Sequence, residues 1–478
     1  MKRLLIAFAF VLSIPDSSLF AQTDNPLPPV DINKIVTTEA IAKEAYLWGY
    51  PMVRFERTRK LLTTTPGYGH APINTFFHAT RLAGPNEKGM SNPLPDTLYS
   101  SAFLDLRQQP MVLQIPKITN RYYSLQFMDA NTTNVSFVSS RTQGAMAGKF
   151  FITGPNFIGA TPAGFQQIRA STNHLWVIGH IEAPFESDVK SAVSLLKKYD
   201  LKPYNVYLGK AKMAKTPDLV AKVTTNMDPR GLAKAGVQFF DELGTALREN
   251  EPTNLEPAIM ERFRSIEVGP GLRTSRITNV REMREAYERA IASAEIDMNN
   301  TVKKDLIKMR NGWSYITRGD GFGNNYTLRA AMSKVYFAET NSIESIHPVT
   351  RVDRDNIRLN GNSTYILRFN KNRLPPVSAF WSVVTYNSRD KSLVENSLRR
   401  YSLGSYSKGL LQNPDGSVDI YISANEPSGK TTNWLPAPRG NFYVMMNMYH
   451  PSTDVISGKY QLPGLQKMTV TPILSLNK

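Results

Sequence analysis

Carboxylate, arginine and tyrosine side chains gather in one stretch of the sequence, residues 96–129. Asp96 and Asp129 occupy strand or turn positions, and Tyr99, Arg121 and Tyr122 lie between them. Glycoside hydrolysis needs two carboxyl groups about 5–9.5 Å apart, one with a raised pKa so that it acts as an acid. The pattern predicts Asp96 and Asp129 as the catalytic pair and the other three residues as substrate-binding. The alternative is that both aspartates only satisfy turn and loop amides.

A second group of candidate residues lies in the C-terminal part of the chain. Arg400 and Tyr401 are adjacent, and Trp434 stands in a proline-rich loop. Aromatic rings stack on sugars, and an arginine binds a polar or anionic group. We therefore expect Arg400, Tyr401 and Trp434 to contact a substrate. Trp381 is expected in the core, because it lies in mid-strand among apolar residues.

Several common catalytic and cofactor motifs are missing. The chain has no HExxH motif, Walker loop, GxSxG elbow, EF-hand loop or GxGxxG fingerprint, and it has no cysteine. Thiol catalysis and thiolate metal sites are therefore excluded. His174 and His180 share one face of a predicted strand but are roughly 20 Å apart along it, too far to bind one ion. No metal site and no cofactor is predicted, although histidines from different segments are free to converge.

The hydrophobic pattern places these residues on an α+β fold. Apolar residues recur at helical spacing in 37–50, 187–199, 228–250 and 280–294, and they alternate within roughly 90–185 and 312–478. We predict a mainly β protein with an α insertion: two antiparallel β-sandwich or jelly-roll-like domains joined by a helical segment. The expected ranges are 37–186, 187–311 and 312–478. Pro51 is expected to end the first helix.

The N-terminus has the features of a secretory signal. Lys2 and Arg3 precede an apolar run from Leu4 to Ser13, which is too short to span a bilayer. We expect residues 1–21 to be a cleaved signal peptide and residues 22–36 to be a leader. The mature protein is then periplasmic or secreted.

The chain is strongly basic, and a generally basic periplasmic surface is the plainest explanation of its charge. The chain has 57 Lys and Arg against 40 Asp and Glu, a formal net charge of +17. These basic residues are scattered and form no basic stripe or nucleic-acid motif, so nucleic-acid binding is not expected. The excess suits a small anionic ligand or an anionic envelope surface. A homodimer is expected only because dimers are the commonest assemblies.

Ordered motifs resemble those of a known two-domain family. They are AYLWGYP (45–51), DTLYS (96–100), RYY (121–123), LPPV (374–377), RYS (400–402) and NWLPAP (433–438). Together they are similar to the domains of unknown function 1254 (N-terminal) and 1214 (C-terminal) of mostly bacterial, often exported proteins. The resemblance implies a fold but no established reaction. Asn447 departs from the arginine usual there, and if that arginine helps bind a ligand, this member takes a different ligand class.

Three functional hypotheses follow. The leading one is an exported protein that binds a small polar or carbohydrate-like ligand in a cleft between its domains, and in one version hydrolyses it like a glycosidase. The second is a non-enzymatic, lectin-like envelope or adhesion protein. The third is a metal-dependent jelly-roll enzyme, which needs histidines and carboxylates to converge. Whether the chain is an enzyme is left open.

Overall fold

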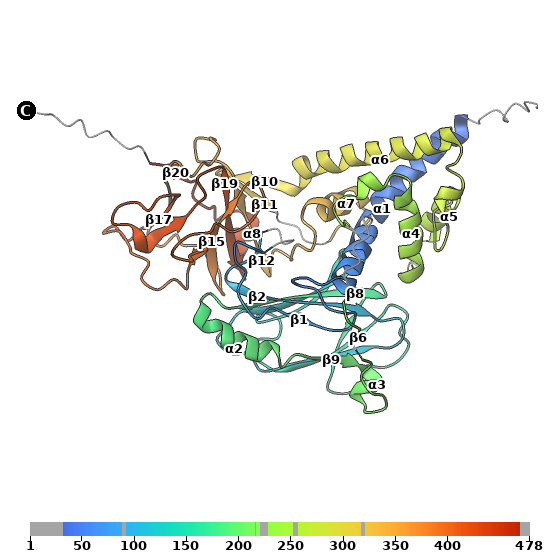
Figure 1. Cartoon of the computed structure of the whole chain (residues 1–478), viewed down its shortest axis with the longest axis horizontal. Coiled ribbons are helices and arrows are strands. Elements are labelled where there is room, and N and C mark those ends of the chain that lie inside the picture. The colour runs from blue at the N-terminus through green and yellow to red at the C-terminus, as the bar shows by residue number, and fades with distance from the viewer. Residues whose placement is uncertain are drawn as a thin grey trace, which may run out of the picture.

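The computed structural model describes residues 32–87, 92–215, 217–219, 228–251, 257–316 and 321–468. The predicted signal peptide and residues 22–31 of the predicted leader lie outside the described residues. Figure 1 shows a β domain in cyan and green, a group of helices beside it, and a second β domain in orange and red. The fold is therefore the predicted α+β arrangement of two sandwich-like β domains with helices.

The N-terminal β domain is a sandwich of two sheets. The first sheet has the order β1 (Phe77–His78), β2 (Thr97–Asp105), β8 (His174–Glu182), β4 (Tyr123–Asp129) and β5 (Asn134–Ser139). The second has the order β7 (Gln166–Arg169), β6 (Gly148–Thr153), β3 (Met111–Ile115) and β9 (Asp200–Pro203). Leu98, Leu104 and Leu125 fill the core between the sheets. Since β9 pairs with β3, the domain's second sheet includes residues beyond the expected limit of 186.

The helices cover the other face of the first sheet. They are α1 (Ile32–Thr64), α4 (Gln238–Glu249), α5 (Pro257–Arg264), α6 (Arg281–Thr301) with its π-helical extension η4 (Val302–Leu306), and α7 (Tyr326–Val335). Shorter elements are α2 (Glu186–Leu196), α3 (Tyr204–Tyr207), η2 (Leu232–Ala235) and η3 (Thr274–Arg276). Phe103 and Trp176 of the sheet join the core of this helical layer. None of the helices in the described ranges is long and apolar enough to cross a membrane.

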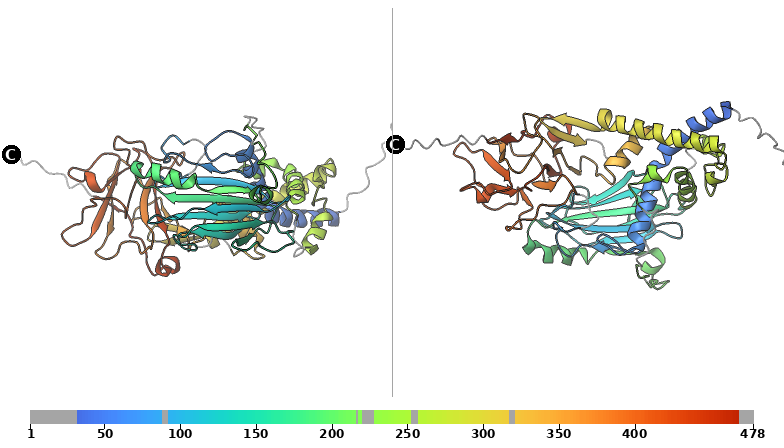
Figure 2. Two further views of the ribbon diagram at one scale, coloured as in Figure 1. Left: turned by 90° about the horizontal axis from the view of Figure 1, so that it is seen from below. Right: turned by 45° about the horizontal axis from the view of Figure 1, so that its top comes forward.

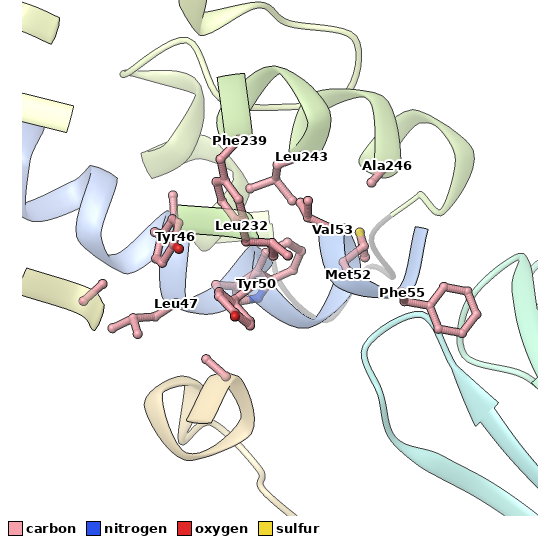
Figure 3. Close-up of a cluster of buried hydrophobic side chains, with 14 of the residues drawn as sticks. Tyr46, Leu47, Tyr50, Met52, Val53, Phe55, Leu232, Phe239, Leu243 and Ala246 are labelled. Atoms are coloured by element: carbon pink, nitrogen blue, oxygen red, sulfur yellow. The ribbon is translucent and has the colours of Figure 1, made fainter. Parts of the chain in front are cut away.

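Helix α1 continues through its predicted end. Pro51 lies inside it, and the helix extends to Thr64. A proline in a helix interior costs about 3 kcal/mol, but tertiary packing can offset this cost. Figure 3 shows the apolar side chains of α1 packed against η2 and α4. A side chain on Gly49 would meet Leu243 of α4 at 2.4 Å, so glycine permits this close approach.

The C-terminal β domain is a second sandwich. One sheet has the order β10 (Ile307–Arg310), β11 (Trp313–Ile316), β13 (Val349–Thr350), β19 (Phe442–Tyr449), β15 (Trp381–Asn387) and β16 (Ser402–Gly404), and β12 (Ser345–Ile346) pairs with β19. The other has β18 (Trp434–Pro436), β17 (Val418–Ser423), β14 (Tyr365–Phe369) and β20 (Gln466–Lys467). Short helices η5 (Thr431–Asn433) and α8 (Thr453–Ser457) lie in its loops. Trp381 is buried in the shared core, as predicted.

The chain that leaves α7 links the three parts. It passes over the first sheet of the N-terminal domain and then enters the C-terminal domain as β12. Figure 2 shows both β domains lying against each other, with α6 and α1 extending away from this junction. Arg54 of α1 holds the start of the link: it donates to the backbone oxygens of Ser333 and Lys334 and lies 4.6 Å from the centre of the Phe337 ring.

Replacing Arg54 with leucine should destabilise the protein. The change leaves two backbone carbonyls at the end of α7 without a donor and removes a cation–π contact, which we expect to cost about 2–4 kcal/mol of unfolding free energy. Urea unfolding would measure this loss of unfolding free energy. The control is Arg264→Leu, which removes an exposed ion pair and should not change the unfolding free energy measurably. Equal stability of the two variants would contradict this role of Arg54.

Candidate functional site

A large cleft opens between the two β domains. It encloses about 1020 Å³ and is lined by loop residues 81–86 and 184–187 of the N-terminal domain and by residues 395–408 of the C-terminal domain. We call it the interdomain cleft. Its walls come from loops that follow β1, β8 and β15, so the cleft exists only because the two domains pack together. It is the candidate location for the ligand site predicted between the halves, and that ligand site stays a prediction.

Basic side chains outnumber acidic ones in the interdomain cleft. Arg81, Arg399, Arg400 and Lys408 line it, together with the acidic residues Glu186 and Glu395. Arg81 is ion-paired with Glu87, and Arg400 donates to backbone oxygens of the loop before and at Trp434. Within the described ranges, the side chains of Arg399 and Lys408 have no such partner. These two cations are therefore available to a ligand.

Aromatic rings form part of the cleft wall. Phe185 of the N-terminal domain meets Tyr406 of the C-terminal domain edge to face, with ring centres 5.7 Å apart. Tyr401 lines the same cleft and packs against the small core around Tyr386. The Tyr406 hydroxyl lies 2.7 Å from Ser402 Oγ, and burial raises its pKa well above its ordinary value. Tyr406 stays neutral and presents a ring and a hydroxyl group.

A buried chain of hydrogen bonds lies behind the cleft and crosses the domain junction. Ser382 donates through its hydroxyl to Asp96, and Asn447 Nδ2 donates to Ser382 Oγ over 3.1 Å. The oxygen of the same Asn447 amide, Oδ1, lies 3.0 Å from His347 Nδ1. Asp96 Oδ1 has no hydrogen-bond partner among the described residues. These hydrogen bonds thus run from His347 to the Asp96 carboxyl group, of which one oxygen accepts a hydrogen bond and the other has no partner among the described residues.

Burial sets the protonation of Asp96. It raises the pKa of this carboxyl group to about 6, although the Ser382 hydroxyl and the positive charge available on His347 act in the opposite direction. The group has no arginine or lysine partner. Asp96 therefore changes its charge near the weakly acidic pH range, inside the domain junction.

A smaller cleft of about 530 Å³ lies on another side of the junction. Arg121, Tyr122, Arg141, Glu182 and His450 are among its lining residues. His450 Nε2 lies 3.1 Å from the buried carboxylate of Glu344, and Arg141 Nε donates to the other oxygen over 2.8 Å. Burial opposes ionisation of Glu344, but these partners hold its pKa below the ordinary value. Arg141 and His450 thus share one buried carboxylate, and Arg121 donates to the Glu182 backbone oxygen and the Ser191 hydroxyl.

The two predicted catalytic aspartates do not form a pair. The Asp96 backbone oxygen accepts a hydrogen bond from the Ala183 amide, just after one end of β8. Asp129 lies opposite Leu175, near the other end of β8. Eight residues of strand separate the two positions by roughly 26 Å. Asp129 accepts hydrogen bonds from the Thr133 backbone amide and the Ser171 hydroxyl. These bonds fit the alternative that the aspartate only stabilises a turn. The geometry does not support shared catalysis, because two-carboxylate hydrolysis needs a spacing below about 10 Å.

The predicted binding residues separate into several places. Arg400 and Tyr401 line the interdomain cleft, and Arg121 and Tyr122 line the smaller one. Tyr99 lies on β2 with its ring 5.7 Å from that of His180, outside both clefts. Trp434 is 7% exposed, and its indole nitrogen donates to the Ser423 backbone oxygen. The Trp434 side chain is thus part of the folded core and does not line the interdomain cleft.

The residues that sequence reasoning did not connect to a site come from loops and from the buried chain, and Asn447 was noted only as a departure from the family's usual arginine. Arg399, Tyr406 and Lys408 gave no signal of their own, although Arg399 precedes the predicted Arg400. His347 and Asn447 lie 100 residues apart in sequence and meet only through the pairing of β12 with β19. One sequence shows no spacing that would connect them.

A group of three possible metal ligands exists in the helical layer. Oxygen and nitrogen atoms of Glu56, His174 and Glu249 lie within 4.8 Å of one another. Both Glu56 and Glu249 are bound by Arg59, and Asn250 also donates to Glu56. Burial opposes ionisation of Glu56, but its bonds to His174 and Arg59 lower its pKa to about 2. The carboxylates already have cationic partners, so the group suits a structural ion-pair network.

The variant Asp96→Asn should change how stability depends on pH. A carboxyl group whose pKa rises from 3.8 to about 6 on folding binds more protons in the folded state, so it destabilises the protein as the pH rises from about 4 to about 6. The asparagine variant lacks this loss, and its unfolding free energy relative to the unmodified chain should increase by about 2–3 kcal/mol over that range. Urea unfolding at pH 4 and pH 7 would measure the difference. A pH-independent difference would contradict the raised pKa.

One solved structure of similar fold and one weaker structural match were found. The structure of the VPA0106 protein from Vibrio parahaemolyticus is similar at a TM-score of 0.70 and 22% identity, over 90% of this chain and 100% of that one. A putative uncharacterized protein from Burkholderia cenocepacia matches at a TM-score of 0.40 and 12% identity, over 92% of this chain and 96% of that one. The search of curated proteins gave no match.

Two family models match parts of the chain that include much of both β domains. The model described as "Protein of unknown function (DUF1254)" matches residues 73–203, and that described as "Protein of unknown function (DUF1214)" matches residues 344–453. The two matches have the order that the sequence motifs indicated. The chain therefore belongs to the two-domain DUF1254/DUF1214 family.

Proposed function

We propose that this protein binds a small, acidic, carbohydrate-like ligand in the interdomain cleft. The observation that carries the proposal is the composition of the cleft. Both domains contribute to it, four basic and two acidic side chains line it, and aromatic rings form part of the wall. Ligand sites in proteins are typically concave, partly aromatic and supplied with a few converging polar groups.

The charge of the cleft favours an anionic group on the ligand. Arg399 and Lys408 line the cleft just before and just after β16, and neither has a partner in the described part of the chain that neutralises it. An arginine and a lysine that share one anion make charge-assisted hydrogen bonds, which are about twice as strong as neutral ones. A carboxylate on the ligand is therefore the expected contact.

The rings of the cleft favour a sugar-like body for the ligand. Tyr401, Tyr406 and Phe185 contribute aromatic rings to the cleft wall, and a sugar ring can stack on such rings. The volume of about 1020 Å³ is at the upper end of the usual range for ligand sites. It is large enough for a mono- or disaccharide.

Binding is the core of this proposal, and hydrolysis is not part of it. Asp96 does not line the cleft, and Asp129 lies at the far end of the sheet. Secretion through the N-terminal signal remains part of the proposal on sequence grounds alone. An acidic sugar binder outside the cytoplasm is consistent with the basic composition of the chain.

Removing the free cations should weaken binding of an acidic sugar. We expect glucuronate to bind more tightly than glucose, and the double change Arg399→Ala and Lys408→Ala to weaken glucuronate binding at least tenfold while leaving glucose binding unchanged. Added salt should weaken glucuronate binding as well. Isothermal titration calorimetry on the full chain would measure both ligands.

The matched control for Lys408→Ala is Lys308→Ala. Lys308 is an exposed lysine on β10, outside the cleft, and its removal changes the net charge by the same amount. Equal losses in the two single variants would show that only overall charge matters. Equal affinity for glucose and glucuronate would overturn the proposed ligand class.

A further inference from the structure

Four polar side chains from three parts of the chain gather over the first sheet, apart from the two clefts. Tyr99 stands on β2, His180 on β8, Glu339 in the link that follows α7, and His347 directly after β12. We call this group the sheet-face site. None of the four lines the interdomain cleft or the smaller cleft. All four keep part of their surface accessible although they lie within the fold.

Hydrogen bonds place the Glu339 segment directly on the sheet. Gln126 of β4 donates through Nε2 to the Glu339 backbone oxygen over 3.2 Å, and the Phe337 ring lies 5.9 Å from that of Trp176 on β8. In the register of β4 and β8, Gln126 is the diagonal neighbour of His180. Diagonal neighbours in a sheet are about 7–8 Å apart, so the Glu339 backbone lies over the part of the sheet that carries His180.

The backbone before Glu339 is held in an unfavourable conformation. Ala338 has a φ of 64°, in the left-handed region that alanine rarely adopts. Such a residue costs about 1–3 kcal/mol and persists only where its surroundings impose it. Here Gln126 binds the carbonyls of Ala338 and Glu339, Asn134 binds that of Glu339, and Arg54 covers Phe337. The fold thus keeps the backbone at Glu339 in place against local strain.

The Glu339 carboxylate has no partner of its own. Its side chain makes no hydrogen bond or ion pair with any described residue, and burial raises its pKa, against the opposing charge available on His347. A carboxylate that gives up hydration without gaining a cation is a strong base, because protonation relieves its desolvation. Structural carboxylates in this protein, such as Glu344 and Glu56, are instead bound by cations.

His180 is arranged as a neutral hydrogen-bond donor. Its Nδ1 lies 3.3 Å from the Thr97 hydroxyl, and with that hydroxyl as donor the ring proton is on Nε2. Burial lowers the pKa of His180 to about 4, with a contribution from the nearby His347, so the ring is uncharged at neutral pH. The Tyr99 ring, 5.7 Å away, forms an aromatic wall beside it. A neutral imidazole of this kind polarises a carbonyl group without giving up its proton.

We propose that Glu339 and His180 form an acid–base site for a small neutral carbonyl compound, in which Glu339 removes a proton from the carbon next to the carbonyl group while His180 binds the carbonyl oxygen. The electron pair of the broken C–H bond forms the carbon–carbon double bond of an enolate, and the carbonyl π electrons move to the oxygen. The proton on Glu339, or one that has exchanged with solvent, then returns to the same carbon, the carbonyl group re-forms and His180 releases its oxygen. The cycle is a proton exchange, and it consumes no oxidant or reductant.

The site favours an uncharged ligand. The carboxyl groups of Asp96 and Glu339 both interact with His347. Among the described residues that shift the pKa values of these two groups, none is an arginine or a lysine. An anionic ligand would meet these groups at short range. This preference is opposite to that of the interdomain cleft, so the two proposals depend on different residues and are separable.

Proton exchange in heavy water tests the proposal directly. Hydroxyacetone, a neutral hydroxyketone, and pyruvate, an anionic ketone, serve as probes, and 1H NMR follows the loss of the protons next to the carbonyl group. The full chain should speed exchange of hydroxyacetone above the buffer rate and of pyruvate far less. Glu339→Gln should abolish at least 99% of this acceleration and His180→Gln most of it, since a positioned base contributes about 10²–10⁴-fold. Glu288→Gln, on the exposed face of α6, should leave it unchanged.

Folding of the variants does not limit this test. Glu339→Gln removes a buried charge that has no partner, so the variant should be at least as stable as the unmodified chain. No acceleration by the unmodified chain, or equal acceleration by the Glu339→Gln variant, would overturn the proposal. A failure here leaves the acidic-sugar proposal untouched, because no residue is shared.

Chemical labelling gives a second, independent readout. Diethyl pyrocarbonate reacts with neutral, accessible imidazoles, and mass spectrometry locates the products. His180 should be labelled at pH 7, and saturating hydroxyacetone should protect it while leaving His70, at the end of α1, unprotected. His180 that never reacts would show that small molecules do not reach the site, and the proposal would be wrong.

Discussion

The contact between Asp96 and Ser382 is the interaction on which the rest of the structure depends. It joins the two β domains through a buried carboxyl group, and neighbouring contacts reinforce it: Tyr386 donates to the Pro93 backbone oxygen over 3.0 Å. Around this contact, Tyr122, Phe380 and Tyr449 form an apolar cluster that belongs to both domains. Because both clefts open at this junction, its geometry determines their shape. A ligand in either cleft would contact both domains.

The helical layer determines where the linking segment lies. Helix α1 packs against α4, α6 and α7, and Arg54 binds the end of α7. The chain that continues from there carries Glu339 over the first sheet and His347 into the second domain. A change in the helices would therefore move groups that lie between the β domains. This arrangement gives the helices a positioning role, in addition to covering apolar surface.

Local patterns predicted the architecture well, because alternation and helical spacing report which face of an element is buried. The strands around Leu98, Tyr123 and Phe442 and the core position of Trp381 are examples. The end of α1 was predicted wrongly at Pro51, since packing against α4 outweighs the local preference. The family was identified from ordered motifs, and both family models support it.

The candidate sites were harder to predict, because they depend on distances between segments that a single sequence does not show. Asp96 and Asp129 are 33 positions apart in the sequence, yet they lie at opposite ends of the sheet, because both face β8 at different positions. Trp434 is in a proline-rich segment, as expected of a loop, but β18 pairs with β17 and buries it. In contrast, His347 and Asn447 meet through a strand pairing that joins distant parts of the chain.

The central claim is that packing of the two domains creates a ligand site between them. The most direct measurement is a crystal structure of the full chain soaked with glucuronate, with an unsoaked crystal as the reference. Our account predicts difference density for the sugar in the interdomain cleft, with its carboxylate at Arg399 and Lys408 and its ring against Tyr401 or Tyr406. Density only at other surfaces, or an empty interdomain cleft at saturating glucuronate, would contradict it.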